Sequence, residues 1–205
     1  MFFKIIISLL CLSGALAAAT NKNFTDLTLE ERRLLNKNDV INAVSGFGVG
    51  ERIAFWADFF IGTPYDPIPI GSYVQNLSIN EEDVFDCMSL TFRVLELTFA
   101  NNESSTLDNA LYFRFKEMGI SNHTNKTKVS TYEGRYEYGE DMIFSKKYGK
   151  IVNEDIGESK KIDAGSHMGG LVSVLSFKEV EENLNGFRSG DIIFFIKNPR
   201  NRIAG

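Results

Sequence analysis

Cysteine and histidine, the residues that most often bind zinc, are scarce in this chain. Two cysteines, Cys11 and Cys87, and two histidines, His123 and His167, are scattered over its 205 residues. The sequence contains no His-Glu-x-x-His motif and no closely spaced cysteine pair, which are the spacings that hold zinc in proteins. It therefore argues against a zinc enzyme, and we expect neither a metal nor another cofactor.

Long blocks of like charge are also absent, although the formal net charge is −5. Without a basic or acidic tail, the chain gives no sign of binding nucleic acid or an anionic membrane surface. Hydrophobic residues make up 43% of the sequence and aromatic residues 12%. At this length, that composition predicts one globular domain with its own core.

Residues 1–19 have the three regions of a secretory signal peptide. Lys4 supplies a positive charge, an apolar stretch follows, and small residues end it in Ala-x-Ala patterns at 15–17 and 17–19. The apolar stretch is too short to span a bilayer as an anchor, and no small residue precedes Cys11 as a lipoprotein signal requires. The alternative is a buried N-terminal helix. We expect export to the periplasm or the medium, no stable membrane anchor, and a single domain over residues 20–205.

Cleavage of that signal would leave Cys87 as the one cysteine of the exported chain. A single thiol cannot form an internal disulfide, and such a leftover cysteine suggests a reactive group or intermolecular pairing. A redox sensor is disfavoured because no resolving cysteine is present.

The stretch 84–100 is the organising segment of the sequence. It reads V-F-D-C-M-S-L-T-F-R-V-L-E-L-T-F-A, has no Gly or Pro, and is long for a strand, which predicts a buried helix. Asp86 is a good N-cap residue. Cys87 would then stand at the helix N-terminus, where free N–H groups and the helix dipole favour a thiolate, with its sulfur aimed outward. The alternative is a structural cysteine packed in the core.

Other patterns predict helices first and strands afterwards. Thr28 and Glu31 form a capping box for a helix that begins near Leu29. Further helices are expected over 51–61, ending at Gly62 after a break at the glycines of 46–50, and over 105–118, ending at Gly119. Strands are expected over 170–177 and 187–197, with a short helix or turn ending at Gly186 between them. This order indicates an α+β domain with an antiparallel sheet.

Two side chains between these elements call for separate interpretation. The segment 62–71 contains three of the four prolines, so it is a fixed, extended loop on which Tyr65 is suited to lining a pocket. Arg135 lies in a segment, 131–144, whose alternating aromatic and charged residues are typical of an irregular strand or loop. We expect Arg135 to be a solvated surface residue.

Three pieces of the sequence, in order, resemble one family. They read F-F-I-G-T-P-Y (59–65), F-D-C-M-S (85–89) and F-R-S-G-D-I-I-F-F (187–195). Together they are similar to the NlpC-type, papain-like cysteine peptidases of bacterial cell walls, and most to the N-acetylmuramoyl-L-alanine amidase-like branch. The resemblance covers residues from about 50 to the end. It implies a papain-like α+β fold with N-terminal helices and a nucleophile at the N-terminus of a buried helix packed on an antiparallel sheet.

The resemblance also implies roles for particular residues. Cys87 would be the nucleophile, with Tyr65 and Asp86 contacting the substrate beside it. The branch usually shows Asp-Cys-x-Thr-Phe-x-Glu, whereas this sequence has Ser89, Leu90 and Phe92 at the last three specified positions. The implied substrate is peptidoglycan or a muropeptide, cleaved at an amide bond without a cofactor.

Family members also use a histidine that follows the strand over 187–197 in the chain. The sequence ends before that point, so we expect a chain that is incomplete at its C-terminus, with the catalytic histidine beyond residue 205 and little activity in this portion. His123 and His167 are poor substitutes in sequence position. The rival interpretation is a secreted, non-catalytic module that binds the cell wall.

Overall fold

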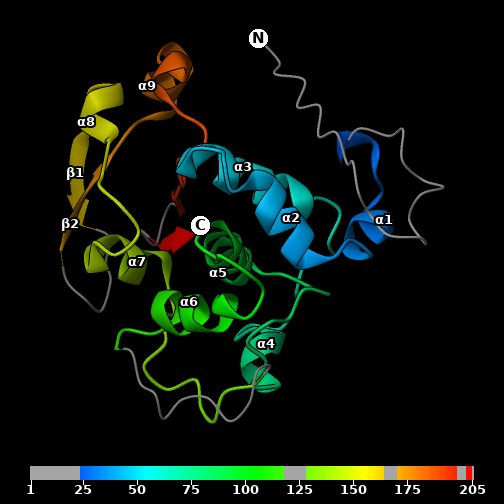
Figure 1. Ribbon diagram of the computed structural model, residues 1–205. Helices are drawn as coiled ribbons and strands as arrows, with labels where there is room; N and C mark the ends of the chain where they lie inside the picture. Colours follow the sequence, from blue (N-terminus) through cyan, green and yellow to red (C-terminus); the bar gives the residue numbers. More distant parts are fainter. Residues whose placement is uncertain (1–23, 118–127, 164–169, 198–201, 205) are drawn as a thin grey trace.

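The computed structural model describes residues 24–117, 128–163, 170–197 and 202–204 (Figure 1). Its helices are η1 (Phe24–Asp26), α1 (Leu29–Arg33), α2 (Lys37–Val44), α3 (Val49–Phe59), α4 (Ser72–Gln75), α5 (Cys87–Thr98), α6 (Ser105–Arg114), α7 (Gly139–Ser145), α8 (Asn153–Ile156), α9 (Phe177–Glu182) and η3 (Leu184–Gly186). Its strands are β1 (Lys160–Asp163), β2 (Leu171–Val174), β3 (Phe195–Lys197) and β4 (Arg202–Ala204). The signal-peptide residues and both histidines lie outside the described residues.

Helix α5 occupies the centre of the fold, as Figure 1 shows. It is the helix predicted from the apolar stretch, and it begins at Cys87 and ends at Thr98. Its main packing partners are α3 and α6. The expected support from an antiparallel sheet is therefore replaced, along most of α5, by helix-on-helix packing.

The largest apolar cluster lies between α2, α3 and α5. Its buried members are Val40, Ile41, Val44, Phe55, Trp56, Phe59, Phe60, Phe85, Val94, Leu97 and Ala100. Full burial of a large apolar side chain stabilises the fold by about 1.5–3 kcal/mol relative to exposure. This cluster fixes α5 against the two preceding helices.

Local sequence signals account for most helix starts in this region. The capping box of Thr28 and Glu31 forms as predicted, with Thr28 N–H donating to Glu31 at 2.8 Å and Glu31 N–H donating to Thr28 at 3.2 Å. Asn36 caps α2, a helix that the sequence interpretation missed. The expected break over 46–50 is also wrong at its end, because α3 already begins at Val49 and contains Gly50.

Helix α6 ends earlier than predicted. It stops at Arg114, and Phe115 takes an extended conformation that forms a β-bridge with Arg135. The predicted end at Gly119 is therefore wrong, because this long-range pairing ends the helix before its local stop signal. The same pairing orders part of the 131–144 segment, whose last residues form α7 instead of a strand or loop.

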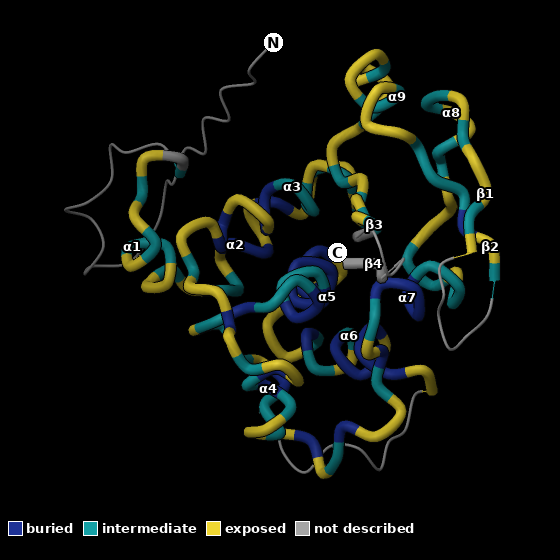
Figure 2. The backbone as a smooth tube through the Cα atoms, turned by 180° about the vertical axis from the view of Figure 1, so that it is seen from behind, coloured by how far each residue is buried: buried dark blue, intermediate teal, exposed yellow. Residues whose placement is uncertain are grey.

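The sheets are small and antiparallel. Strand β1 pairs only with β2, with Ile162 opposite Val172, and β3 pairs only with β4, with Ile196 opposite Ile203. The predicted strands over 170–177 and 187–197 thus exist in shortened form. Figure 2 shows that buried backbone gathers around α5 and α6, whereas α8, α9 and β1 are mostly intermediate or exposed.

None of the helices that the structure describes is both long and apolar enough to cross a bilayer.

Candidate functional site

Cys87 is the first residue of α5, directly after the N-cap Asp86. The Asp86 Oδ1 atom accepts a hydrogen bond from the N–H of Ser89 at 2.6 Å. In return, the Asp86 N–H donates to the Ser89 Oγ atom at 3.0 Å. This reciprocal pair fixes the helix start and confirms the N-cap prediction. The Cys87 N–H belongs to the first turn, whose N–H groups have no acceptor within the helix.

The environment of the Cys87 side chain is apolar. The thiol is free and half-buried, and it packs against a cluster whose buried members include Met88, Phe92, Tyr136 and Met142. Four partly buried residues from other segments pack against the same cluster: Ile53, Tyr148, Ile192 and Phe194. The expectation of a sulfur aimed outward is therefore corrected to a thiol that is partly covered.

The proline-containing loop lies beside the residues that lead into Cys87. The Asp66 N–H donates to the Phe85 carbonyl at 2.8 Å, and the Phe85 N–H donates to the Pro64 carbonyl at 3.0 Å. Tyr65 and Phe85 thus form a parallel β-bridge. The Tyr65 side chain itself is 74% exposed, so it does not line an enclosed pocket.

Asp66 is the residue that holds this loop, and sequence reasoning missed it. Its buried carboxylate accepts from the N–H groups of Ile68 at 3.0 Å and Ser72 at 2.6 Å, and from the Ser72 hydroxyl at 2.9 Å. Burial opposes ionisation, but the bonds from Ser72 and Ile68 outweigh it and lower the pKa of Asp66. The sequence does contain a signal for this role. An aspartate often accepts a hydrogen bond from the N–H two residues later in a turn, as Asp66 does from Ile68.

Gly71, at the C-terminal end of the loop 62–71, lies close to the side chains of Tyr73 and Asp86. Gly71 has φ = 85°, and a Cβ at that position would clash with the Tyr73 ring and lie 3.3 Å from Asp86 Oδ2. Burial raises the pKa of Tyr73, and the nearby Asp86 charge raises it further. Only glycine fits here, because both the backbone conformation and the space exclude a side chain.

The third segment of the family resemblance also approaches this site. The turn at Ser189 and Gly190 lies so close to α3 that a Cβ on Gly50 would clash with the Ser189 carbonyl. Beyond the turn, Ile192 and Phe194 pack against the cluster that covers Cys87. The three resembling segments, although far apart in the sequence, therefore meet around Cys87.

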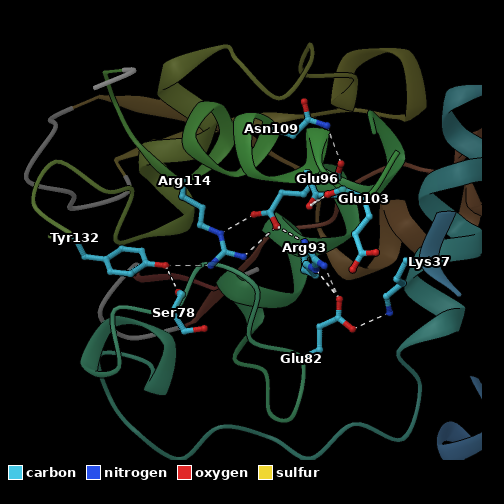
Figure 3. A network of polar contacts seen from close by, with 10 residues as sticks. Lys37, Ser78, Glu82, Arg93, Glu96, Glu103, Asn109, Arg114 and Tyr132 are labelled. Carbon is cyan, nitrogen blue, oxygen red and sulfur yellow. Dashed lines mark hydrogen bonds and ion pairs between the residues drawn. The ribbon is translucent and has the colours of Figure 1, made fainter. Parts of the chain in front are cut away.

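A buried ionic network lies further along α5 (Figure 3). The Glu96 carboxylate is fully buried and accepts from Arg114 Nε at 2.6 Å, Arg114 Nη2 at 3.1 Å and Arg93 Nη1 at 3.2 Å. Arg114 also donates to the Tyr132 hydroxyl at 3.2 Å, which in turn donates to the Ser78 carbonyl. These bonds join α5 to α6 and to the loops on either side.

The network continues towards α2 through Glu82. Arg93 Nη2 lies 2.6 Å from Glu82 Oε1, and Lys37 Nζ lies 2.7 Å from Glu82 Oε2. Burial alone would raise the pKa of Glu82, but Arg93 and Lys37 together lower it. Burial lowers the pKa of Lys37, partly offset by Glu82. Although Phe92 replaces an acidic group of the amidase-like pattern, Glu96 places a carboxylate one helical turn later.

Arg135 differs from its expected role. Its side chain is only 20% exposed, and it forms an ion pair with Glu137 at 3.2 Å. Its Nη1 atom donates to the Tyr132 carbonyl at 3.4 Å. The prediction of a solvated surface arginine is therefore wrong, because the bridge between Phe115 and Arg135 draws this segment against the core.

A cavity of about 1040 Å³ adjoins the Cys87 cluster without including Cys87. Residues from α3, α7, β1, β2, α9 and the segment 192–196 line it, and most of them are apolar. Ile53, Tyr148 and Phe194 both line this cavity and pack against the Cys87 cluster. Within the described part of the chain, no three His, Cys, Asp or Glu side chains gather closely enough to hold a metal ion.

No protein-family model matches the chain, and no curated protein or solved structure matches it significantly.

Proposed function

We propose that the protein is an exported, papain-like cysteine hydrolase that cleaves an amide bond in peptidoglycan or in muropeptides, with Cys87 as its nucleophile. Tyr65 and Asp86 are the proposed substrate contacts. The proposal includes the N-acetylmuramoyl-L-alanine amidase-like family assignment and removal of residues 1–19 on export.

The observation that carries the proposal is the meeting of three separate segments at one thiol. The loop 62–71 is hydrogen-bonded to Phe85, the residue two positions before Cys87. The segment after Gly190 packs against the apolar cluster that covers Cys87. These segments carry the family resemblance, and an unrelated fold has no reason to bring all three to the same cysteine.

The proposed reaction has two steps. The Cys87 thiolate attacks the amide carbonyl carbon, and the oxyanion that forms accepts a hydrogen bond from the Cys87 N–H. Collapse of this intermediate breaks the C–N bond, and the amine leaves with a proton from a general acid, so that a thioester remains. Water then attacks the thioester and gives a proton back to the group that acted as general acid, so that a carboxylic acid and the restored thiolate result. Because His123 and His167 lie outside the described residues, the proposal rests on the nucleophile and its surroundings.

Hydrolysis of purified muropeptides by the full-length protein, which supplies the catalytic histidine expected beyond residue 205, tests this proposal when the products are followed by mass spectrometry. Cys87→Ser should reduce the rate by about 10³-fold or more, because it removes the group that forms the acyl-enzyme. Ser45→Ala, a change of similar size at the exposed end of α2, should leave the rate unchanged. Hydrolysis that survives Cys87→Ser would refute the proposal.

A non-catalytic wall-binding module is the second candidate. The observation that favours it is the apolar, half-buried setting of Cys87, which also suits a structural cysteine. A binding module would sediment with insoluble peptidoglycan and would hydrolyse no muropeptide. Its Cys87→Ser variant would bind peptidoglycan as well as the parent protein does.

A further inference from the structure

Arg135 is a charged side chain that is largely withdrawn from water. It is 20% exposed, and its ion-pair partner Glu137 is 44% exposed. Among the described residues, its guanidinium donates one hydrogen bond, from Nη1 to the Tyr132 carbonyl, and its other N–H groups donate none. A guanidinium carries its donors in a planar fork whose geometry matches that of a carboxylate. Arg135 therefore has donors to spare for a group of opposite charge.

The backbone on either side of Arg135 is held in place. The Lys116 N–H donates to the Gly134 carbonyl at 2.8 Å, and the Tyr136 N–H donates to the Arg114 carbonyl at 2.9 Å. These bonds fix the segment against the end of α6. A binding group on a fixed backbone has less conformational freedom to lose when a ligand arrives.

Two separate routes of contact lead from Arg135 towards Cys87. The next residue, Tyr136, is buried in the apolar cluster against which Cys87 packs. In the other direction, Arg135 donates to the carbonyl of Tyr132. The centroid of the Tyr132 ring lies 5.3 Å from the centroid of the Tyr73 ring. Arg135 is thus tied both to the surroundings of the thiol and to Tyr73.

The second route ends at Asp86, the residue before Cys87. A Cβ on Gly71 would clash with the Tyr73 ring and would lie 3.3 Å from Asp86 Oδ2, so the ring and the carboxylate are neighbours. Burial raises the pKa of Tyr73, the Asp86 charge raises it further, and the Arg135 charge lowers it. The opposite charges of Asp86 and Arg135 thus act on the same tyrosine, next to the start of α5.

The proposed substrate carries a group that the spare donors of Arg135 fit. The stem peptide of a muropeptide contains a glutamate residue whose second carboxyl group lies outside the peptide linkages. An arginine and a carboxylate form two parallel, charge-assisted hydrogen bonds, which are stronger than bonds between neutral groups. A carboxamide at the same position has a single acceptor oxygen and no charge, so it cannot form this pair.

We propose that Arg135 is a specificity-determining residue that binds the free carboxylate of the glutamate residue in the stem peptide of the substrate. It selects muropeptides with this carboxylate over those in which the carboxylate is amidated. The inference rests on the proposed function, because it requires that a muropeptide binds beside Cys87.

Two muropeptides that differ only at this glutamate, as a free carboxylate or a carboxamide, test the inference. With the full-length protein, we expect kcat/KM to be about 10–100-fold higher for the carboxylate form. Arg135→Gln should abolish this preference by slowing hydrolysis of the carboxylate form, and should change kcat/KM for the carboxamide form by less than about threefold. Arg33→Gln is the matched control, because the Arg33 side chain is 33% exposed and pairs with Asp83 at 3.8 Å. This control should keep the preference.

The carboxamide form also detects a purely structural role of Arg135. If Arg135 only supported the fold, Arg135→Gln would lose activity on both forms alike, and that result would overturn the inference.

Calorimetric binding of the same muropeptides to Cys87→Ser separates this inference from the proposed hydrolysis. We expect the carboxylate form to bind about 10-fold more tightly or better than the carboxamide form, and the double variant Cys87→Ser, Arg135→Gln to bind both equally. This result would support the carboxylate site even if the parent protein hydrolysed neither form, which would refute only the hydrolase. Equal binding of both forms by Cys87→Ser would overturn the inference while leaving the hydrolase intact.

Discussion

The N-terminal and C-terminal regions of the molecule differ sharply in how many of their side chains are buried. In the N-terminal region, which comprises the described residues of 24–148, two apolar clusters and an ionic network include residues of α5, and a third apolar cluster joins α4, α6 and neighbouring loops. In the C-terminal region, residues 149–204, Val172 is the one buried residue among those whose burial the structure describes, 149–163 and 170–196. The first region therefore supplies a rigid frame for Cys87, whereas the second contributes only its turn at Gly190 and two apolar side chains to that frame.

The largest expected effect lies in the buried network of the N-terminal region. Glu96→Ala leaves the guanidinium groups of Arg93 and Arg114 without their shared carboxylate. Removing one partner of a buried ion pair costs about 3–5 kcal/mol, even though the intact pair contributes little net stability. Urea unfolding measures this change. Glu181→Ala, at an exposed position of α9, should change the unfolding free energy by less than about 0.5 kcal/mol. Equal effects of the two variants would contradict the difference between the regions.

Two valines offer a direct comparison of packing. Val44 and Val172 are both buried, at 1% and 3% exposure, but Val44 lies inside the large helical cluster and Val172 contacts only partly buried neighbours. Val44→Ala should lower the unfolding free energy by about 2–3 kcal/mol, because the dense surroundings cannot close the cavity. Val172→Ala should cost about 1 kcal/mol or less, because its open surroundings relax. Thermal or urea unfolding of both variants measures the difference between these two losses of unfolding free energy. A larger loss for Val172→Ala than for Val44→Ala would contradict the comparison.

The sequence predicted the parts of the fold that depend on local signals. Capping residues located the starts of α1 and α5, and Gly186 marked the end of the short helices after β2. The end of α6 was mispredicted because Phe115 pairs with Arg135, twenty residues later. Helix α7 was missed for a different reason. Its start is a local cap, in which Asp141 accepts from the N–H groups of Glu137 and Tyr138, but the alternation of aromatic and charged residues over 131–144 favoured an irregular strand or loop.

The candidate site was predictable to a similar degree. Asp86 and Cys87 stand where the helix pattern indicated, and the proline-containing loop lies beside them. The network around Glu96 escaped notice because its partners, Arg114 and Glu82, come from other segments and give no spacing pattern along α5. The pattern of the stretch 84–100 predicted a buried helix, but it did not show that the charged Arg93 and Glu96 would be buried with it.

A smaller effect is expected at the loop beside Cys87. Asp66→Asn removes the charge that accepts from Ser72 and Ile68, and should lower the unfolding free energy by about 1–2 kcal/mol near neutral pH. Because the folded pKa of Asp66 is lowered, its contribution is fully present above the unfolded value of about 3.9 and is lost as the pH falls through the folded value. Unfolding measured between about pH 2 and 7 should show the parent and the variant converging in acid. A constant difference would show that the charge of Asp66 is not what holds the loop.

The central claim is that the thiol at the meeting point of the three segments is a nucleophile, and covalent capture tests it most directly. The folded chain is incubated with a muropeptide that carries an electrophile in place of the amide, and the product is mapped by mass spectrometry. We predict one adduct, on Cys87, whose formation slows when an unmodified muropeptide competes. If the folded chain stays unmodified while the urea-unfolded chain reacts at Cys87, the thiol is a packing residue and the proposed function is wrong.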